Sequence, residues 1–289
     1  MQIEAAIKDW AQLHNDETSA PVKSKIIRPV NKSTLIIRAI LLSLSIITVY
    51  TLLTMDYKGV DILKGFSDTL ANFRTMFLQP HSERLSLLDA FYEVGITMGL
   101  AFLSTLFGAF IALILGLLAA QNLSGKILTN IIKGFIAFIR AVPTILWVLI
   151  FAVAAGLGSA AAVIGMTFHS ISYLTKAYSE SFESLDKSVI EALKASGADW
   201  WQIVFQAVIP SSITFMLSWT FLRFEINFAN AVAMGAAAGA AGIGFDMFMA
   251  SEFYFDIPEV GLITYFILAF AFLLELVSTN MKGRLQKAA

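Results

Sequence analysis

The chain has 289 residues, of which 57% are apolar and only 14% are charged. A soluble domain carries roughly 25% charged residues, and one of this size has too little interior to hide so much apolar surface. The mean hydropathy of +0.75 agrees. The composition therefore excludes a soluble enzyme and predicts an all-α integral membrane protein in the lipid bilayer.

The net charge of −1 argues against a nucleic-acid partner, because such proteins carry a basic excess. The absence of cysteine excludes disulfides, thiolate metal sites and a cysteine nucleophile. The three histidines are too scattered for a metal cluster. We therefore expect no metal, no cofactor and no nucleic acid.

Residues 1–34 precede the first apolar stretch and are predicted to be a cytoplasmic segment. Ile3, Ile7 and Trp10 recur at helical spacing, which predicts a short amphipathic helix on the inner membrane face. A disordered tail is the alternative. Residues 35–91 then form the first transmembrane helix and an external loop; no small-residue cleavage site follows the helix, so we expect it to be retained.

Six stretches are apolar and long enough to cross a bilayer, which takes about 20 residues per helix. In chain order the predicted spans are 35–55, 92–119, 135–155, 159–175, 209–234 and 259–279. A glycine-rich break at 156–158 separates the third span from the fourth. The pattern predicts six transmembrane helices.

The distribution of lysine and arginine predicts the orientation, because cytoplasmic loops carry the excess of these residues. With the N-terminus inside, the cytoplasmic segments hold 13 of the 20 basic residues and the external segments hold 4. We therefore expect a multi-pass protein of the cell (inner) membrane with both termini in the cytoplasm.

The longest cytoplasmic loop, 178–208, joins the fourth and fifth spans. A simple helical hairpin needs only about 2–8 connecting residues, so this loop has room for structure of its own. Ser188 with Glu191 three residues later predicts a capping box, and Gly197 predicts a left-handed helix end.

A second short helix is predicted after this glycine. Asp199 with Gln202 caps its start, and it enters the membrane at Pro210. Local rules alone describe a well-capped helical hairpin at the lipid surface.

The same loop resembles the signature loop of ABC-importer permeases. That signature is glutamate-alanine-alanine, three residues, glycine, nine residues, isoleucine-x-leucine-proline. Glu191, Ala192, Gly197 and Pro210 stand at its spacing, while other residues occupy the third, isoleucine and leucine positions. Further resemblance, to the phosphonate-type branch, lies in 116–123, 140–158 and 223–244.

The resemblance implies a type I ABC importer permease fold, with residues 92–285 as a permease core of five transmembrane helices. The loop would be a coupling helix that docks on a cytoplasmic ATP-binding subunit. The residues expected to carry ATPase coupling are Glu191, Ala192, Gly197, Asp199 and Pro210. No phosphate-binding loop motif is present, so another subunit must supply the energy.

The fifth span carries charges at membrane depth. Arg223, Asn227 and Asn230 follow i, i+4, i+7 spacing and share one face, whereas Glu225 points elsewhere. Such residues line a substrate pathway or make polar contacts between helices, and the sequence leaves both open. Ala229 stands where the phosphonate-type pattern has a second arginine, which weakens the assignment of a phosphonate.

A glycine-rich turn follows the fifth span. We expect Gly242 and Gly244 to form part of the external gate of the pathway. The stretch lacks the frame of a nucleotide-binding loop.

The sequence therefore predicts a non-enzymatic permease subunit of an ATP-driven ABC importer. Its expected partners are an ATP-binding subunit pair, an external solute-binding protein and a second permease copy in a homodimer. The expected solute is a phosphonate, phosphite or related phosphorus oxyanion. The alternatives are an importer permease for an unrelated small solute and an ion-gradient-driven transporter or channel; a membrane enzyme is disfavoured because its motifs are missing.

Overall fold

The computed structural model describes residues 32–56, 59 and 61–288, with side chains to residue 283. Every regular element in this part of the chain is a helix, which confirms the predicted all-α class. The amphipathic helix predicted around residues 3–10 lies outside the described residues. The chain divides into two compact units, Met1–Ile62 and Leu63–Ala289, and each is described by itself.

The described part of the first unit is the helix α2 (Lys32–Thr54), which matches the first predicted span. Apolar side chains are exposed all around it, as expected of a helix that lipid surrounds. The hydroxyls of Ser45, Thr48 and Thr51 each donate to the carbonyl four residues earlier. These polar groups are thereby satisfied within the helix, as a bilayer requires.

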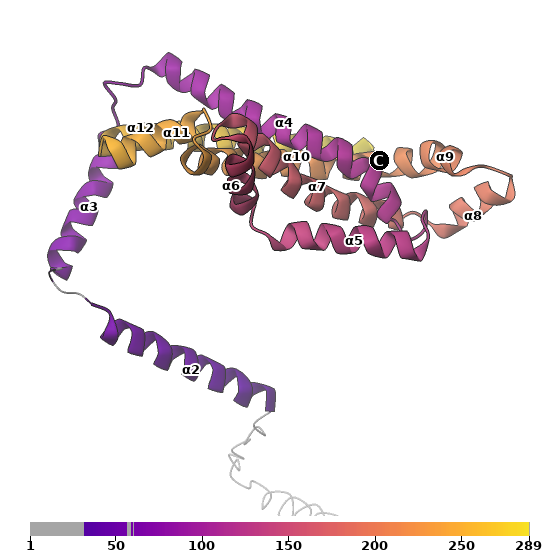
Figure 1. The fold of residues 1–289 in the computed structure, drawn as a ribbon, viewed down its shortest axis with the longest axis horizontal. Coiled ribbons are helices and arrows are strands. Elements are labelled where there is room, and N and C mark those ends of the chain that lie inside the picture. Colours follow the sequence, from indigo (N-terminus) through magenta and orange to yellow (C-terminus); the bar gives the residue numbers. More distant parts are fainter. Residues whose placement is uncertain (1–31, 57–58, 60, 289) are drawn as a thin grey trace, which may run out of the picture. The chain divides into compact units, whose positions relative to one another are not determined.

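The second unit is built on four long helices, and α4, α7 and α10 run alongside one another (Figure 1). Their bounds are α4 (Leu87–Ala119), α7 (Ser159–Glu183), α10 (Ile209–Ala238) and α12 (Ile257–Ala288), and a shorter helix, α3 (Ile62–Leu78), begins at the unit boundary. Gly108 and Gly116 of α4 face Ser170 and Tyr178 of α7 with no room for a methyl group without adjustment. Small residues thus bring α4 and α7 close together, as is common between membrane helices.

The predicted third span, 135–155, is wrong as a single helix. The chain forms α5 (Lys126–Ala141) and α6 (Thr144–Ala155), which are bent by 87° at the break between them. Pro143 is the cause: it has no N–H to donate, and its ring keeps Val142 extended at φ −90°, ψ 123°.

The predicted number of six spans is also not reached in the described residues. By length and composition, four helical segments can cross a membrane, or five if the bent pair is one span. The predicted span 159–175 falls within α7, whose hydroxyl, histidine and charged side chains lower its hydropathy below that of a lipid-facing helix. Much of α7 is instead buried among the other helices.

Three apolar clusters hold the second unit together, the smallest of them between α4, α5 and α7. The first lies among α4, α7, α10 and α12 and includes Met166, Phe228 and Ile263. The second lies at the loop end of α7, where Tyr178 and Phe182 pack against the segment that connects α7 to α10. This second cluster fixes the position of the long loop.

Candidate functional site

The long loop folds into the helices α8 (Lys187–Ala195) and α9 (Trp200–Ile203). The predicted capping box at Ser188 is wrong, because Asp186 is the N-cap. Its Oδ1 accepts the backbone N–H of Ser188 at 2.9 Å, so the helix starts earlier. This hydrogen bond lowers the pKa of Asp186.

The turn between α8 and α9 has the predicted form. Gly197 is left-handed, with φ +85°, and its N–H donates to the Lys194 carbonyl while Ala198 N–H donates to the Leu193 carbonyl. This pair of bonds is a Schellman helix end. Asp199 and Gln202 then cap α9 reciprocally, each accepting the other's backbone N–H at 2.8 Å.

The base of the loop packs against the helix bundle, whereas its tip is exposed. Ile190 and Ile203 are buried in the second apolar cluster. The indole N–H of Trp200 donates to the Leu123 carbonyl at 3.0 Å, which ties the loop to the α4–α5 connection. The predicted coupling residues Glu191, Ala192, Gly197 and Asp199 are all exposed on the loop.

Pro210 lies at a different place, at the start of α10. A π-helical turn, η1 (Val204–Val208), immediately precedes α10. Because proline lacks an N–H and clashes with the carbonyl four residues earlier, a wider turn accommodates it here. α9, η1 and α10 therefore form one continuous helical path from the loop into the membrane.

Arg223 and Asn227 of α10 meet residues of two other helices in the interior. Arg223 Nε donates to Ser170 Oγ of α7 at 3.0 Å. Asn227 Nδ2 donates to the same Ser170 Oγ at 2.9 Å and to Thr105 Oγ1 of α4 at 2.8 Å. We call these four residues the buried polar clamp, since each is at most 3% exposed.

The clamp holds the arginine without a carboxylate among the described residues. Ser170 and Thr105 give their own hydroxyl protons to helix carbonyls, so their oxygens are free to accept. The Arg223 guanidinium carbon lies 5.5 Å from the centre of the Tyr173 ring, in cation–π range. Arg223 Nε and Asn227 Nδ2 are thus interhelical donors, whereas Arg223 Nη2 and Asn227 Oδ1 are buried without a hydrogen-bond partner among the described residues.

The other two predicted residues of the fifth span lie elsewhere. Asn230 is half-buried and is not in the clamp. Glu225 lines a groove of about 450 Å³ between α10 and α12, and Glu275 lines the same groove. Of the four residues predicted to line the pathway, Arg223 and Asn227 are therefore buried in the clamp, whereas Glu225 faces the groove and Asn230 belongs to neither.

The predicted gate residues form a tightly packed turn at the other end of α10. Ile243 N–H donates to Thr97 Oγ1 of α4 at 3.0 Å, and Gly242 has φ +115°. A Cβ on Gly244 would overlap the Val232 carbonyl, so its backbone touches that of α10 directly. The turn is therefore locked against both α4 and α10.

The helix α11 (Ile243–Phe248) begins in this turn, outside the spans, and carries Asp246. Burial raises the pKa of Asp246 to about 6, and the carboxylates of Glu93, Glu259 and Asp89 add to the shift. Asp246 Oδ2 is buried and has no hydrogen-bond partner among the described residues.

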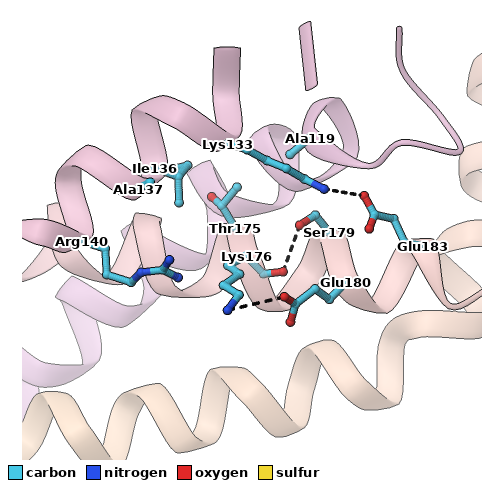
Figure 2. Close-up of a pocket in the computed structure, with 10 residues that line it drawn as sticks. All are labelled: Ala119, Lys133, Ile136, Ala137, Arg140, Thr175, Lys176, Ser179, Glu180 and Glu183. Carbon is cyan, nitrogen blue, oxygen red and sulfur yellow. Dashed lines mark hydrogen bonds and ion pairs between the residues drawn. The ribbon is translucent and has the colours of Figure 1, made fainter. Parts of the chain in front are cut away.

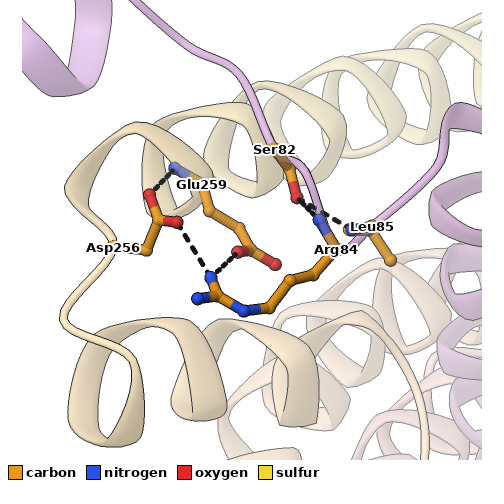
Figure 3. Close-up of polar contacts among 5 residues, drawn as sticks. All are labelled: Ser82, Arg84, Leu85, Asp256 and Glu259. Atoms are coloured by element: carbon orange, nitrogen blue, oxygen red, sulfur yellow. Dashed lines mark hydrogen bonds and ion pairs between the residues drawn. The ribbon is translucent and has the colours of Figure 1, made fainter.

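Ion pairs of Arg84 join the α3–α4 connection to the start of α12 (Figure 3). Arg84 Nη1 contacts Asp256 Oδ2 at 3.0 Å and Glu259 Oε2 at 3.3 Å, and its guanidinium stacks 4.4 Å from the centre of the Tyr254 ring. Glu259 is only 4% exposed. The Arg84 ion pairs therefore neutralise a buried carboxylate beside α11.

A cavity of about 200 Å³ lies between α5 and α7 (Figure 2). Three cations and two carboxylates line it: Lys133, Arg140, Lys176, Glu180 and Glu183. Lys133 Nζ pairs with Glu183 Oε1 at 2.8 Å, and Lys176 Nζ lies 3.6 Å from Glu180 Oε1. This site was not among those predicted from the sequence, although Lys126, Lys133 and Arg140 recur every seven residues along α5.

Residues 112–288 match the family described as binding-protein-dependent transport system inner membrane component. The chain belongs to this family. The match covers the C-terminal end of α4 and every later helix, including the long loop. Its members are transport components, so membership and the apolar helices together make this chain a multi-pass membrane protein and not an enzyme.

Two curated relatives extend the comparison. The chain is 28% identical over 213 residues to a phosphate-import permease protein, PhnE, of Mycolicibacterium smegmatis, covering 73% of this chain and 39% of the relative. It is 29% identical over 183 residues to a phosphite transport system permease protein, PtxC, of Stutzerimonas stutzeri, covering 63% of this chain and 66% of the relative. The chain thus spans less than two thirds of each relative.

A solved structure of the MetNI methionine ABC transporter in an inward-facing conformation has the same fold. It superposes with a TM-score of 0.63 at 18% identity and covers 71% of this chain and 99% of the solved chain. The predicted type I ABC importer permease fold is therefore confirmed.

Proposed function

We propose that this chain is the permease subunit of an ATP-driven importer that moves a phosphorus oxyanion into the cell. The observation that carries the proposal is the loop of α8 and α9 within a family-matched region. Its tip is exposed, while Ile190, Ile203 and Trp200 hold its base against the helix bundle. A helical loop with a packed base and an exposed tip is suited to transmit force from an ATPase subunit.

The proposed partners are a cytoplasmic ATP-binding subunit pair, an external solute-binding protein and a second copy of the permease. Glu191 and Ala192 are the proposed ATPase contacts, and their exposure on the loop supports this role; Gly197 and Asp199 shape the turn. This arrangement requires the loop and both termini to be cytoplasmic and the turn at 242–244 to serve as the external gate. Residues 92–285 are the proposed permease core.

The proposed solute follows from the names of the relatives, one a phosphate-import permease and the other a phosphite permease. Methionine is the competing solute, because the solved structure of the same fold is a methionine transporter. That structure is only 18% identical, so it supports the fold and not the solute. A probable D-methionine transport system permease protein of Pasteurella multocida is, however, 29% identical over 159 residues, so the uptake assay has to discriminate between the two solutes.

The test is ATP-driven uptake in proteoliposomes that contain this chain, its ATPase and its binding protein. We expect uptake of phosphite or methylphosphonate when ATP is enclosed, and none of methionine. Uptake that continues without ATP would contradict the proposal and favour an ion-gradient-driven transporter. Uptake of methionine alone would support an ATP-driven importer but show that its solute is methionine and not a phosphorus oxyanion.

The coupling role has a separate test. Glu191→Arg and Gly197→Val are expected to leave ATP hydrolysis active while abolishing uptake. Glu83→Arg, at an exposed acid outside the long loop, is the matched control and should transport normally. Normal transport by both loop variants would refute the coupling role.

A further inference from the structure

The cavity between α5 and α7 contains more positive than negative charge. Two of its cations are already paired with carboxylates, Lys133 with Glu183 and Lys176 with Glu180. Arg140 is the third, and among the described residues no carboxylate lies within ion-pair distance of it. The lining therefore carries one uncompensated cation.

Arg140 is an unpaired charge within an apolar part of the chain. It lies in the last turn of α5, in a bent helix pair whose length and composition suit a broken span or a re-entrant loop. Charged residues in such segments are rare, and they commonly face water-filled cavities or mark ion pathways. In Figure 2 the guanidinium extends from α5 toward the space that faces α7.

A second, independent feature points into the same cavity. Thr175 is 1% exposed, and its buried hydroxyl has no hydrogen-bond partner among the described residues. An unsatisfied buried hydroxyl is unfavourable, and a ligand acceptor oxygen would satisfy it. Lys176 also lines the cavity, and its Nζ is held by Glu180 only at the long distance of 3.6 Å, so it retains protons to donate.

The donor set matches an anion that has several acceptor oxygens. Arginine binds phosphoryl oxygens with two parallel N–H donors, while a hydroxyl and an ammonium can take the remaining oxygens. The volume of about 200 Å³ equals roughly six or seven water molecules at ~30 Å³ each. That is enough for a small oxyanion with a few waters, and too little for a nucleotide.

We propose that this cavity is a transit site where a small phosphorus oxyanion binds the permease during import, with Arg140 as its main contact and Thr175 and Lys176 as further donors. The proposal rests on the proposed function for the identity of the solute. It places a solute contact between α5 and α7, apart from the predicted α10 face, where Arg223 Nε and Asn227 Nδ2 are engaged in the clamp.

Equilibrium binding of radiolabelled inorganic phosphate and methylphosphonate to the purified full-length permease tests this inference. The protein is held in phosphatidylcholine nanodiscs without the binding protein. We expect saturable binding that Arg140→Gln weakens at least tenfold, that Arg140→Lys weakens less, and that Thr175→Val weakens several-fold. Lys126→Gln, on the same stripe of α5 but outside the cavity lining, is the matched control and should bind like the wild type.

Three outcomes would overturn the proposal. They are no binding by the wild type, equal binding by Arg140→Gln, and binding that disappears when phosphatidylglycerol replaces phosphatidylcholine, which would assign the site to a lipid headgroup. Arg140 is exposed, so its variants should fold, and unchanged thermal stability without ligand verifies this.

The uptake assay separates this inference from the proposed function. Arg140-dependent binding in a protein that shows no ATP-driven uptake retains the anion site and removes the importer. If the protein shows ATP-driven uptake but Arg140→Gln binds the anion as well as the wild type does, the importer is retained and the anion site is removed.

Discussion

Arg223 of α10 and Ser170 of α7 are joined inside the helix bundle by a 3.0 Å hydrogen bond from Nε to Oγ. Asn227, one turn later, donates to the same oxygen and reaches Thr105 of α4. Three helices are thereby tied at one point. Because α10 continues directly from the long loop, a displacement of the loop is expected to move α10, α7 and α4 together.

Asn227→Ala is expected to lower the free energy of unfolding by about 1–2 kcal/mol, since two interhelical hydrogen bonds are lost. Denaturant titration of the purified protein in detergent measures it. Asn230→Ala is the matched control on the same helix, and no hydrogen bond of Asn230 is found among the described residues, so stability should change little. Equal effects of the two substitutions would contradict the clamp.

Local sequence patterns predicted the structure well where local forces decide it. Gly197 and the Asp199–Gln202 pair lie in the predicted turn and cap, because a left-handed residue and a reciprocal cap need only near neighbours. The predicted face of Arg223 and Asn227 was also correct. Asn230 lies two turns beyond Arg223, and helical spacing does not reveal how far along the helix the packing partners extend.

Patterns failed where distant segments or backbone breaks decide the outcome. Hydropathy treats 135–155 as one span because both sides of Pro143 are apolar, although the proline itself signals a break. The transit cavity unites Arg140 of α5 with Thr175 and Lys176 of α7. No local spacing relates these residues, so only the packing of the two helices could identify them together.

Gly197→Ala is expected to destabilise the protein by about 1–2 kcal/mol, because an L-residue at φ +85° is strained. No atom lies within 4 Å of an added Cβ, so the cost is conformational and not steric. Gly134→Ala in α5 is the control: it also has open space, and alanine in a helix interior should stabilise by roughly 0.5–1 kcal/mol. Thermal unfolding should therefore shift in opposite directions, and a parallel shift would argue against this account.

Gly244→Ala is expected to distort the turn at the end of α10. The new methyl group would overlap the Val232 carbonyl, and backbone cannot move aside as a flexible side chain can. We expect a loss of about 1–3 kcal/mol, typical of overpacking, together with loss of uptake. Gly99→Ala, where an added Cβ meets nothing within 4 Å, should preserve both. Wild-type uptake by Gly244→Ala would refute a tightly closed turn.

Arg84→Met is expected to lower the melting temperature, because it leaves Glu259 buried without its cation. Arg74→Met, an exposed cation on α3, is the matched control and should leave the melting temperature unchanged. Adding Glu259→Gln to the Arg84 variant should recover part of the loss, since the buried charge is then gone. No recovery in this double variant would show that the methionine disturbs packing and not charge balance.

Asp246→Asn is expected to change how stability depends on pH. The pKa of Asp246 is about 6 in the folded protein, above its ordinary value of 3.8, because the carboxyl is partly buried and faces Glu93 and Asp89 of α4 and Glu259 of α12. The folded state therefore holds a proton that the unfolded state has already lost. This group's contribution to stability falls as the pH rises from about 4 to 6 and is constant above that window.

The asparagine variant should consequently be more stable than the wild type above pH 6, by roughly 1 kcal/mol after allowance for solvent screening at this partly buried carboxyl. The gain should shrink toward zero as the pH approaches 4. Thermal unfolding of both proteins across this range measures the difference, with Asp68→Asn on the exposed face of α3 as the control. A gain that is independent of pH would mean that the asparagine acts through a new hydrogen bond and not through removal of the charge.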